Sequence, residues 1–253
     1  MQFLRVVPFS LMLTLPASGQ TADSRTTSPK PPLTEAARKL TPEQRADVLM
    51  ARKMYREAID SYREEKPTAI LMNKIGIAYH QLGDFAAARK HYERAMKMDK
   101  NYPDAVNNDG TIFYALKRYK QAISRYKKAL QLSPNTASFW SNLGTAEYSL
   151  GRYSEMSEAY QKALSLDPEI FERRGTVGTE LQDRSVTDRA RYHYELARLY
   201  AKSGKNELAL QYLRKALEEG LKDKVKLTQT PEFAELRETD EFKQVMTLEP
   251  RVL

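Results

Sequence analysis

Residues 140–168 read WSNLGTAEYSLGRYSEMSEAYQKALSLDP, and this stretch decides the fold because its pattern recurs along the chain. Three glycines, Gly76, Gly110 and Gly144, stand 34 residues apart. At fixed offsets after each glycine come an aromatic residue, a tyrosine and an alanine, in the columns Phe85, Tyr119 and Tyr153; Tyr92, Tyr126 and Tyr160; and Ala95, Ala129 and Ala163. A period of this length predicts an array of stacked helical repeats.

The same stretch resembles the tetratricopeptide repeat family. The residues that carry the resemblance are Trp140, Leu143, Gly144, Tyr153, Tyr160, Ala163 and Pro168. The resemblance implies an all-α fold, a right-handed superhelical solenoid of antiparallel helix pairs. It also implies that the concave side of the solenoid is the surface that takes ligands.

The repeats, together with residues typical of helix starts and ends, divide the chain into segments. A capping box at Thr41 and Gln44 opens the first helix, and Gly83 and Gly151 supply the left-handed residue that ends a helix. The predicted segments are a signal peptide at 1–19, a flexible linker at 20–33, a degenerate N-terminal helix pair at 34–68, three repeats at 69–170, an irregular insertion at 171–187, a fourth repeat at 188–220 and a C-terminal helical cap at 221–253.

The N-terminus has the features of a secretory leader. Arg5 precedes an apolar run at 6–15, and small residues follow in the sequence PASG at 16–19. We expect cleavage after Gly19 and an exported protein, periplasmic or secreted. The alternative is a leader retained as an N-terminal anchor, although Pro8 interrupts a run already shorter than the ~18 residues that a membrane span requires.

The composition limits the classes of partner. With 41% hydrophobic and 29% charged residues, the sequence suits an array with a wide polar surface and excludes a multi-span membrane protein. The net charge is +8, and removal of the leader, which holds one Arg and no acid, leaves +7. This modest excess favours a weak attraction to acidic surfaces. Nucleic acid is not an expected partner, because the cations are scattered among nearly as many acids.

No catalytic or metal-binding motif accompanies the repeats. His80, His91 and His193 lie in different units, and cysteine is absent from the sequence. No phosphate-binding glycine loop, nucleophile elbow or HExxH motif occurs. The acids follow helical charge patterns and are interpreted as solvated. We therefore expect no enzyme, no cofactor and no metal.

A polar stripe on the first helix of each repeat is the candidate binding site. Residues at −2, +1 and +4 from each glycine share one helix face. The predicted peptide-binding groove consists of Asn108, Thr111, Tyr114, Asn142, Thr145, Tyr148, Lys74 and His80. Its two asparagines can donate to and accept from a peptide backbone, and the resemblance implies a similar role. We expect both asparagines to be exposed, so that their replacement leaves folding nearly intact; the alternative is that they are only solvated polar residues.

Two departures from the family pattern qualify this site. The family's carboxylate clamp has Lys and Arg around such asparagines, whereas this chain has Asp104, Asn107, Ser138 and Ser141, so capture of a C-terminal carboxylate is not expected. In addition, Asp109 stands where the family usually has leucine before the glycine. Because a buried lone carboxylate is costly, Asp109 should reach a hydroxyl, a helix terminus or a basic partner.

The sequence thus predicts an exported, non-catalytic scaffold that binds a protein or peptide in its concave groove. One alternative is a structural component of an envelope assembly that uses the ends and convex faces of the solenoid. Another is a wall- or carbohydrate-binding module that uses Tyr114, Tyr148 and the positive charge.

Overall fold

The computed structural model describes residues 40–172 and 186–249, and these residues form helices with no strand among them. The predicted signal peptide and linker lie outside the described residues, as does most of the predicted insertion. The α-helices are α2 (Pro42–Ala51), α3 (Tyr55–Tyr62), α4 (Ala69–Gln81), α5 (Phe85–Met98), α6 (Pro103–Ala115), α7 (Tyr119–Leu132), α8 (Ala137–Ser149), α9 (Tyr153–Leu166), α10 (Val186–Lys202), α11 (Asn206–Glu218), α12 (Lys224–Gln229) and α13 (Asp240–Met246). Two short 3-10 helices, η1 (Pro231–Phe233) and η2 (Leu236–Glu238), separate the last two.

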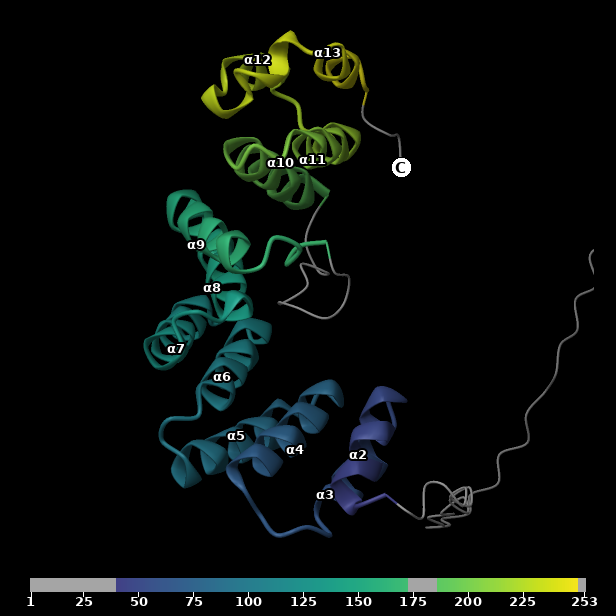
Figure 1. Ribbon diagram of the computed structural model, residues 1–253, viewed down its shortest axis with the longest axis vertical. Coiled ribbons are helices and arrows are strands. Elements are labelled where there is room, and N and C mark those ends of the chain that lie inside the picture. The colour runs from purple at the N-terminus through teal and green to yellow at the C-terminus, as the bar shows by residue number, and fades with distance from the viewer. Residues whose placement is uncertain (1–39, 173–185, 250–253) are drawn as a thin grey trace, which may run out of the picture. The chain divides into compact units, whose positions relative to one another are not determined.

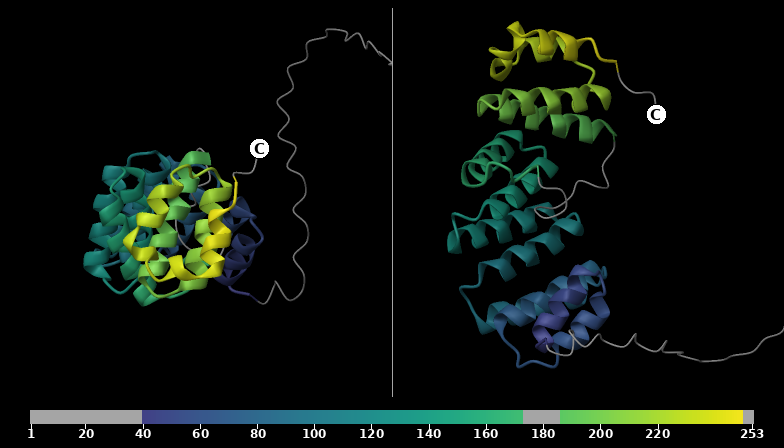
Figure 2. Two further views of the ribbon diagram at one scale, coloured as in Figure 1. Left: turned by 90° about the horizontal axis from the view of Figure 1, so that it is seen from above. Right: turned by 45° about the vertical axis from the view of Figure 1, so that its right-hand side comes forward.

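The helices pack as consecutive pairs. The closest packing joins α4 to α5, α6 to α7, α8 to α9 and α10 to α11, and each pair also contacts the next. Figure 1 shows helices that are neighbours in sequence lying side by side, and Figure 2 gives the same order in two further views. The predicted all-α solenoid of helix pairs is confirmed.

The helix ends follow the predicted local signals. The Thr41 hydroxyl accepts from the Gln44 backbone N–H, and the Gln44 side chain accepts from the Thr41 N–H, which confirms the capping box. Gly83 and Gly151 adopt φ of 76° and 73° after the first helices of their repeats. In the second repeat Lys117 takes this conformation with φ of 59°, although a side chain disfavours it.

The glycine and tyrosine columns are in contact with each other. A Cβ placed on Gly76, Gly110 or Gly144 would lie within 2.7 Å of the ring of Tyr92, Tyr126 or Tyr160, the tyrosine of the same repeat. All three tyrosines are fully buried, as is Tyr200 in the fourth repeat. The absence of a side chain on the first helix therefore makes room for the ring on the second.

The C-terminal end of the array is closed by short helices. Phe233 in η1 and Phe242 in α13 are buried in the cluster that also holds Leu213 and Leu217 of α11. Helices begin at Lys224, Pro231 and Asp240, within the segment 221–253 that the sequence predicted as a helical cap. These elements cover apolar surface that the last helix pair would otherwise expose to water.

Candidate functional site

The predicted polar stripe lies on α4, α6 and α8, the first helices of three repeats, and we call this surface the first-helix face. Its residues come together because positions three or four apart share one side of a helix, and because the stacking repeats bring equivalent positions next to each other. Besides the predicted residues, it includes Asn73 and Asn107, each three residues before a repeat glycine.

A continuous chain of side-chain amides crosses the three helices of this face. Asn142 Nδ2 donates to Asn107 Oδ1 at 3.0 Å, and Asn107 Nδ2 donates to Asn108 Oδ1 at 3.3 Å. Asn108 Nδ2 then donates to Asn73 Oδ1 at 3.0 Å, and Asn73 Nδ2 donates to the Tyr102 hydroxyl at 3.3 Å. We call these four asparagines the amide chain. The sequence placed two of its members, Asn108 and Asn142, in the predicted groove but did not indicate Asn73 and Asn107 as their partners.

The amide chain has one unsatisfied end. All four amides donate in the same direction along the chain, so the Oδ1 atoms of Asn73, Asn107 and Asn108 each accept a hydrogen bond from a neighbouring amide. Asn142 Oδ1 is buried and has no hydrogen-bond partner. A buried acceptor without a partner costs roughly 1–3 kcal/mol, and most such groups in folded proteins are paired. Among the four Oδ1 atoms of the amide chain, that of Asn142 is thus the one whose capacity to accept a hydrogen bond is unused within the described residues.

The expectation that the stripe is exposed is wrong for four of its residues. Tyr114, Asn142, Thr145 and Tyr148 are only 8%, 5%, 3% and 4% exposed. The Thr145 hydroxyl hydrogen-bonds the Tyr160 hydroxyl at 2.8 Å, and both groups are buried. Asn108 and Thr111 remain half-buried. The accessible part of the stripe is therefore smaller than the sequence predicted.

The two stripe tyrosines are packed against other rings of this chain. Tyr114 lies 5.3 Å from Tyr119, and Tyr148 lies 5.7 Å from Tyr153, between ring centroids. Tyr192 of α10, in the fourth repeat, also contacts Tyr148, with the two ring centroids 5.4 Å apart. Because α10 brings this ring onto α8, Tyr148 is covered from outside its own repeat. Neither stripe tyrosine presents the open ring face that the carbohydrate-binding alternative requires.

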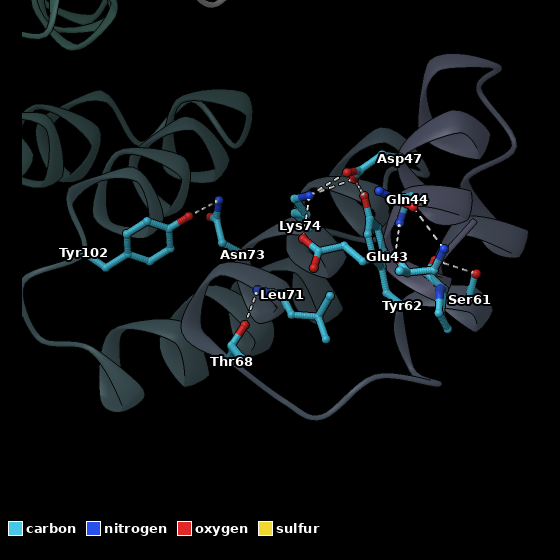
Figure 3. A network of polar contacts seen from close by, with 12 residues as sticks. Glu43, Gln44, Asp47, Ser61, Tyr62, Thr68, Leu71, Asn73, Lys74 and Tyr102 are labelled. Atoms are coloured by element: carbon cyan, nitrogen blue, oxygen red, sulfur yellow. Dashed lines mark hydrogen bonds and ion pairs between the residues drawn. The ribbon is translucent and has the colours of Figure 1, made fainter. Parts of the chain in front are cut away.

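Lys74 is held by the N-terminal helix pair. Its Nζ lies 2.8 Å from Glu43 Oε1 and 2.8 Å from Asp47 Oδ2, and the Tyr62 hydroxyl donates to Asp47 (Figure 3). Burial opposes the charge of Lys74, but hydrogen bonds to Asp47 and Glu43 outweigh it, so the pKa of Lys74 is raised. Its charge is thus neutralised within the chain and not offered to a ligand, contrary to its predicted place in the groove.

His80, the other outlying residue of the predicted groove, packs edge-on against Phe85 with a centroid distance of 5.6 Å. Burial lowers the pKa of His80 below its ordinary value, so its imidazole is neutral at pH 7. The eight predicted residues are therefore not one open surface. Asn108 belongs to the amide chain, and Thr111 lies on the same helix. Lys74 instead pairs with the N-terminal helix pair, and His80 packs against Phe85 within the first repeat.

We expected a hydroxyl, a helix terminus or a basic group as the partner of Asp109, and the structure shows two basic groups. The carboxylate is fully buried, with Arg89 Nε at 2.9 Å from Oδ1 and Arg125 Nε at 2.8 Å from Oδ2. The Arg89 contact is a hydrogen bond, whereas the Arg125 contact is an ion pair without hydrogen-bond alignment. Both guanidinium groups lie over the Phe113 ring, at 4.6 and 5.7 Å from its centroid. Arginines on the second helices of two repeats thus share one acid of α6.

Two further acids are buried, contrary to the expectation that the acids are solvated. Glu147 pairs with Arg152 at 3.1 Å, and Glu195 pairs with Arg198 at 2.8 Å. Burial raises the pKa of Glu195 although the charge of Arg198 acts in the opposite direction. A sequence signal existed for Glu147, because it stands three residues after its glycine, where the other repeats have aromatic residues.

No metal site or membrane span was found in the described parts of the chain. Within residues 40–172 and 186–249, no cluster of three or more His, Asp or Glu side chains is placed to hold a metal ion. None of the helices described there is both long and apolar enough to cross a bilayer.

Sequence comparison assigns the repeats. Models described as TPR repeat or tetratricopeptide repeat match residues 43–101, 110–151, 137–170 and 190–219. The chain belongs to the tetratricopeptide repeat family. No protein of curated function is significantly similar to it in sequence.

Several solved structures are similar to this tetratricopeptide repeat chain at low sequence identity. The Cut9–Hcn1 hetero-tetramer of APC/C is 18% identical, with a TM-score of 0.51 over 81% of this chain and 35% of that chain. MamA from Desulfovibrio magneticus is 23% identical, with a TM-score of 0.48 over 73% and 95%. The first TPR domain of Spaghetti (RPAP3), bound to an HSP90 peptide, is 26% identical, with a TM-score of 0.40 over 42% and 83%.

Proposed function

We propose that this tetratricopeptide repeat protein is an exported, non-catalytic scaffold whose first-helix face binds an extended segment of a partner protein. The observation that carries the proposal is the amide chain, which ends in a buried acceptor without a partner at Asn142 Oδ1. A buried acceptor without a partner destabilises the fold, so the requirement for stability does not explain why the amide chain ends at Asn142 Oδ1.

A peptide backbone carries the hydrogen-bond donors and acceptors that can pair with the polar groups of this face. An extended segment presents N–H and C=O groups at regular intervals, and an asparagine amide both donates and accepts. Asn108 and Thr111 are half-buried and so remain accessible, and the second N–H of Asn108 is available beside the one that it gives to Asn73. A backbone N–H of the partner would satisfy Asn142 Oδ1 once the segment lies along the face.

The proposal is tested with peptides selected for binding to the whole mature chain by display of a random library. The site variant is Asn108→Ala, and the control is Lys128→Gln, an exposed change on the second helix α7. Loss of hydrogen bonds worth ~1.4 kcal/mol weakens binding by about tenfold. We expect this loss for Asn108→Ala in calorimetric titrations, and affinity unchanged by Lys128→Gln.

Equal affinity of both variants for the selected peptides would argue against the first-helix face. A partner that is then lost only on substitution of exposed residues on the second helices would favour the envelope-assembly alternative. Circular dichroism of each variant separates a binding defect from a folding defect.

Export is tested separately from binding. The basis for it is the Arg5 leader and the apolar run at 6–15, followed by small residues. We expect the native protein to begin at or within a few residues of Gln20 and to be found outside the cytoplasm. Mass spectrometry of the protein purified from its own cells decides this, because an intact N-terminal methionine on a cytoplasmic protein would contradict export.

A further inference from the structure

A second cluster of polar groups lies apart from the amide chain, where α3, α4 and α5 meet. The rings of Tyr79 on α4 and His91 on α5 stack, with centroids 5.3 Å apart and an angle of 18° between the planes. Arg63, which follows the last residue of α3, donates from Nη2 to the Tyr79 hydroxyl at 2.7 Å. Three helices from two adjacent units therefore hold the His91 ring and the Arg63 guanidinium in place.

The charge around His91 is positive and uncompensated. Lys90 and Arg94 stand one residue before and three residues after His91 on α5. Burial, followed by the charges of Arg63, Arg94 and Lys90, lowers the pKa of His91 below its ordinary value. No carboxylate among the described residues lies within ion-pair distance of these three cations, whereas Arg89 on the same helix has two acidic partners.

The two nitrogens of the His91 ring differ in their surroundings. Nδ1 is buried and has no hydrogen-bond partner in the described structure. A buried N–H without an acceptor is unfavourable, so the proton of the neutral ring belongs on Nε2. The ring can then donate from Nε2 to a ligand, and an anion beside it would favour the protonated form.

We propose that Arg63, Lys90, Arg94 and His91 form a binding site for a phosphate group. Phosphate suits the cluster because it has several strong acceptor oxygens and up to two negative charges, which three cations and an imidazole can share. The planar guanidinium group of each of the two arginines can donate two parallel hydrogen bonds to two oxygens of the phosphate. A carboxylate, with one charge and two oxygens, would leave part of the cluster uncompensated.

The site is tested in the full chain with inorganic phosphate as the probe. Imidazole resonances are followed by NMR as phosphate is added, with chloride at equal ionic strength as the comparison. We expect the pKa of His91 to rise with phosphate beyond any change in chloride. His80, buried against Phe85, and His193, hydrogen-bonded to Glu219, are internal controls that should not respond.

Matched variants separate a specific site from general charge. Arg94→Gln removes one cation of the cluster, and Lys128→Gln makes the same kind of change 34 residues later, at the equivalent position of the next repeat. Because Arg94→Gln removes the charge-assisted hydrogen bonds that this arginine would donate, it should weaken phosphate binding by about tenfold or more. Lys128→Gln should leave it unchanged.

Vesicles distinguish the source of the phosphate. Binding to phosphatidic acid vesicles, competed by free phosphate and absent with phosphatidylcholine, would assign the site to a lipid headgroup. Binding of free phosphate without vesicle binding would assign it to a soluble phosphate compound. The proposal is overturned if chloride raises the pKa of His91 as much as phosphate does, or if Arg94→Gln binds phosphate as tightly as the unchanged protein.

Discussion

Replacement of Gly144 by alanine tests the contact on which the repeat packing depends. A Cβ at this position would lie 2.3 Å from Tyr160 Cδ1 and 2.4 Å from Cε1, whereas ordinary contacts begin at 3.4 Å. The ring must therefore retreat by about 1.1 Å. It is fully buried and its hydroxyl is hydrogen-bonded to Thr145, so little space is open to it.

The expected loss combines two opposing effects. Overpacking of a well-packed core costs ~1–3 kcal/mol, while alanine favours the helix over glycine by up to ~1 kcal/mol. We expect Gly144→Ala to lower the free energy of unfolding by roughly 1–2 kcal/mol. The equivalent distances are 2.5 Å at Gly76 and 2.7 Å at Gly110, so the loss should decrease in the order Gly144, Gly76, Gly110.

Urea unfolding followed by circular dichroism measures this order. The double variant Gly144→Ala/Tyr160→Leu completes a double-mutant cycle with the two single variants. The smaller leucine side chain leaves room for the methyl group of the new alanine. The two changes together should cost at least ~0.5 kcal/mol less than the sum of their separate effects. The reasoning is refuted if Gly144→Ala is as stable as the unchanged protein, or if Gly110→Ala is the most destabilised of the three.

Three other substitutions test the core and the buried polar groups by the same unfolding assay. Asp109→Asn should cost roughly 1–2 kcal/mol, because it removes the buried counter-charge that Arg89 and Arg125 share. Glu93→Gln, at the exposed second partner of Arg89, should stay within ~0.5 kcal/mol. Tyr126→Ala deletes a fully buried ring and should cost ~3–5 kcal/mol, and unchanged melting would mean that the tyrosine column is not core. Asn142→Ala should cost roughly 1–3 kcal/mol because Asn107 Oδ1 loses its donor, and a neutral effect would contradict the amide chain.

The prediction for Asn142→Ala replaces the expectation drawn from the sequence. That expectation took both asparagines as exposed and their substitution as harmless to folding. That expectation is wrong for Asn142, which is buried and hydrogen-bonded across helices. A binding experiment on this residue would therefore mix a loss of contact with a loss of stability. Asn108 also hydrogen-bonds across helices, to Asn73, but it is half-buried, so it is the better site variant when circular dichroism monitors its folding.

The sequence by itself determined the helix pairs and the contacts inside each repeat. Gly76 meets Tyr92, Gly110 meets Tyr126 and Gly144 meets Tyr160 because both partners lie 16 residues apart in one helical hairpin, whose geometry the spacing sets. The need of Asp109 for a partner was also predictable, since a buried carboxylate needs compensation wherever it occurs, but the choice of two arginines was not.

Only the tertiary structure decided which polar residues remain open to a partner. Asn142 is joined to Asn107 across two helices, and Tyr148 is covered by Tyr192 of α10, which follows after the segment where the repeat pattern is lost. The 34-residue period assigns a helix face to a residue, but burial depends on what the rest of the chain places against that face. The amide chain and its unpaired end arise from such contacts between units, so no pattern within one repeat could predict them.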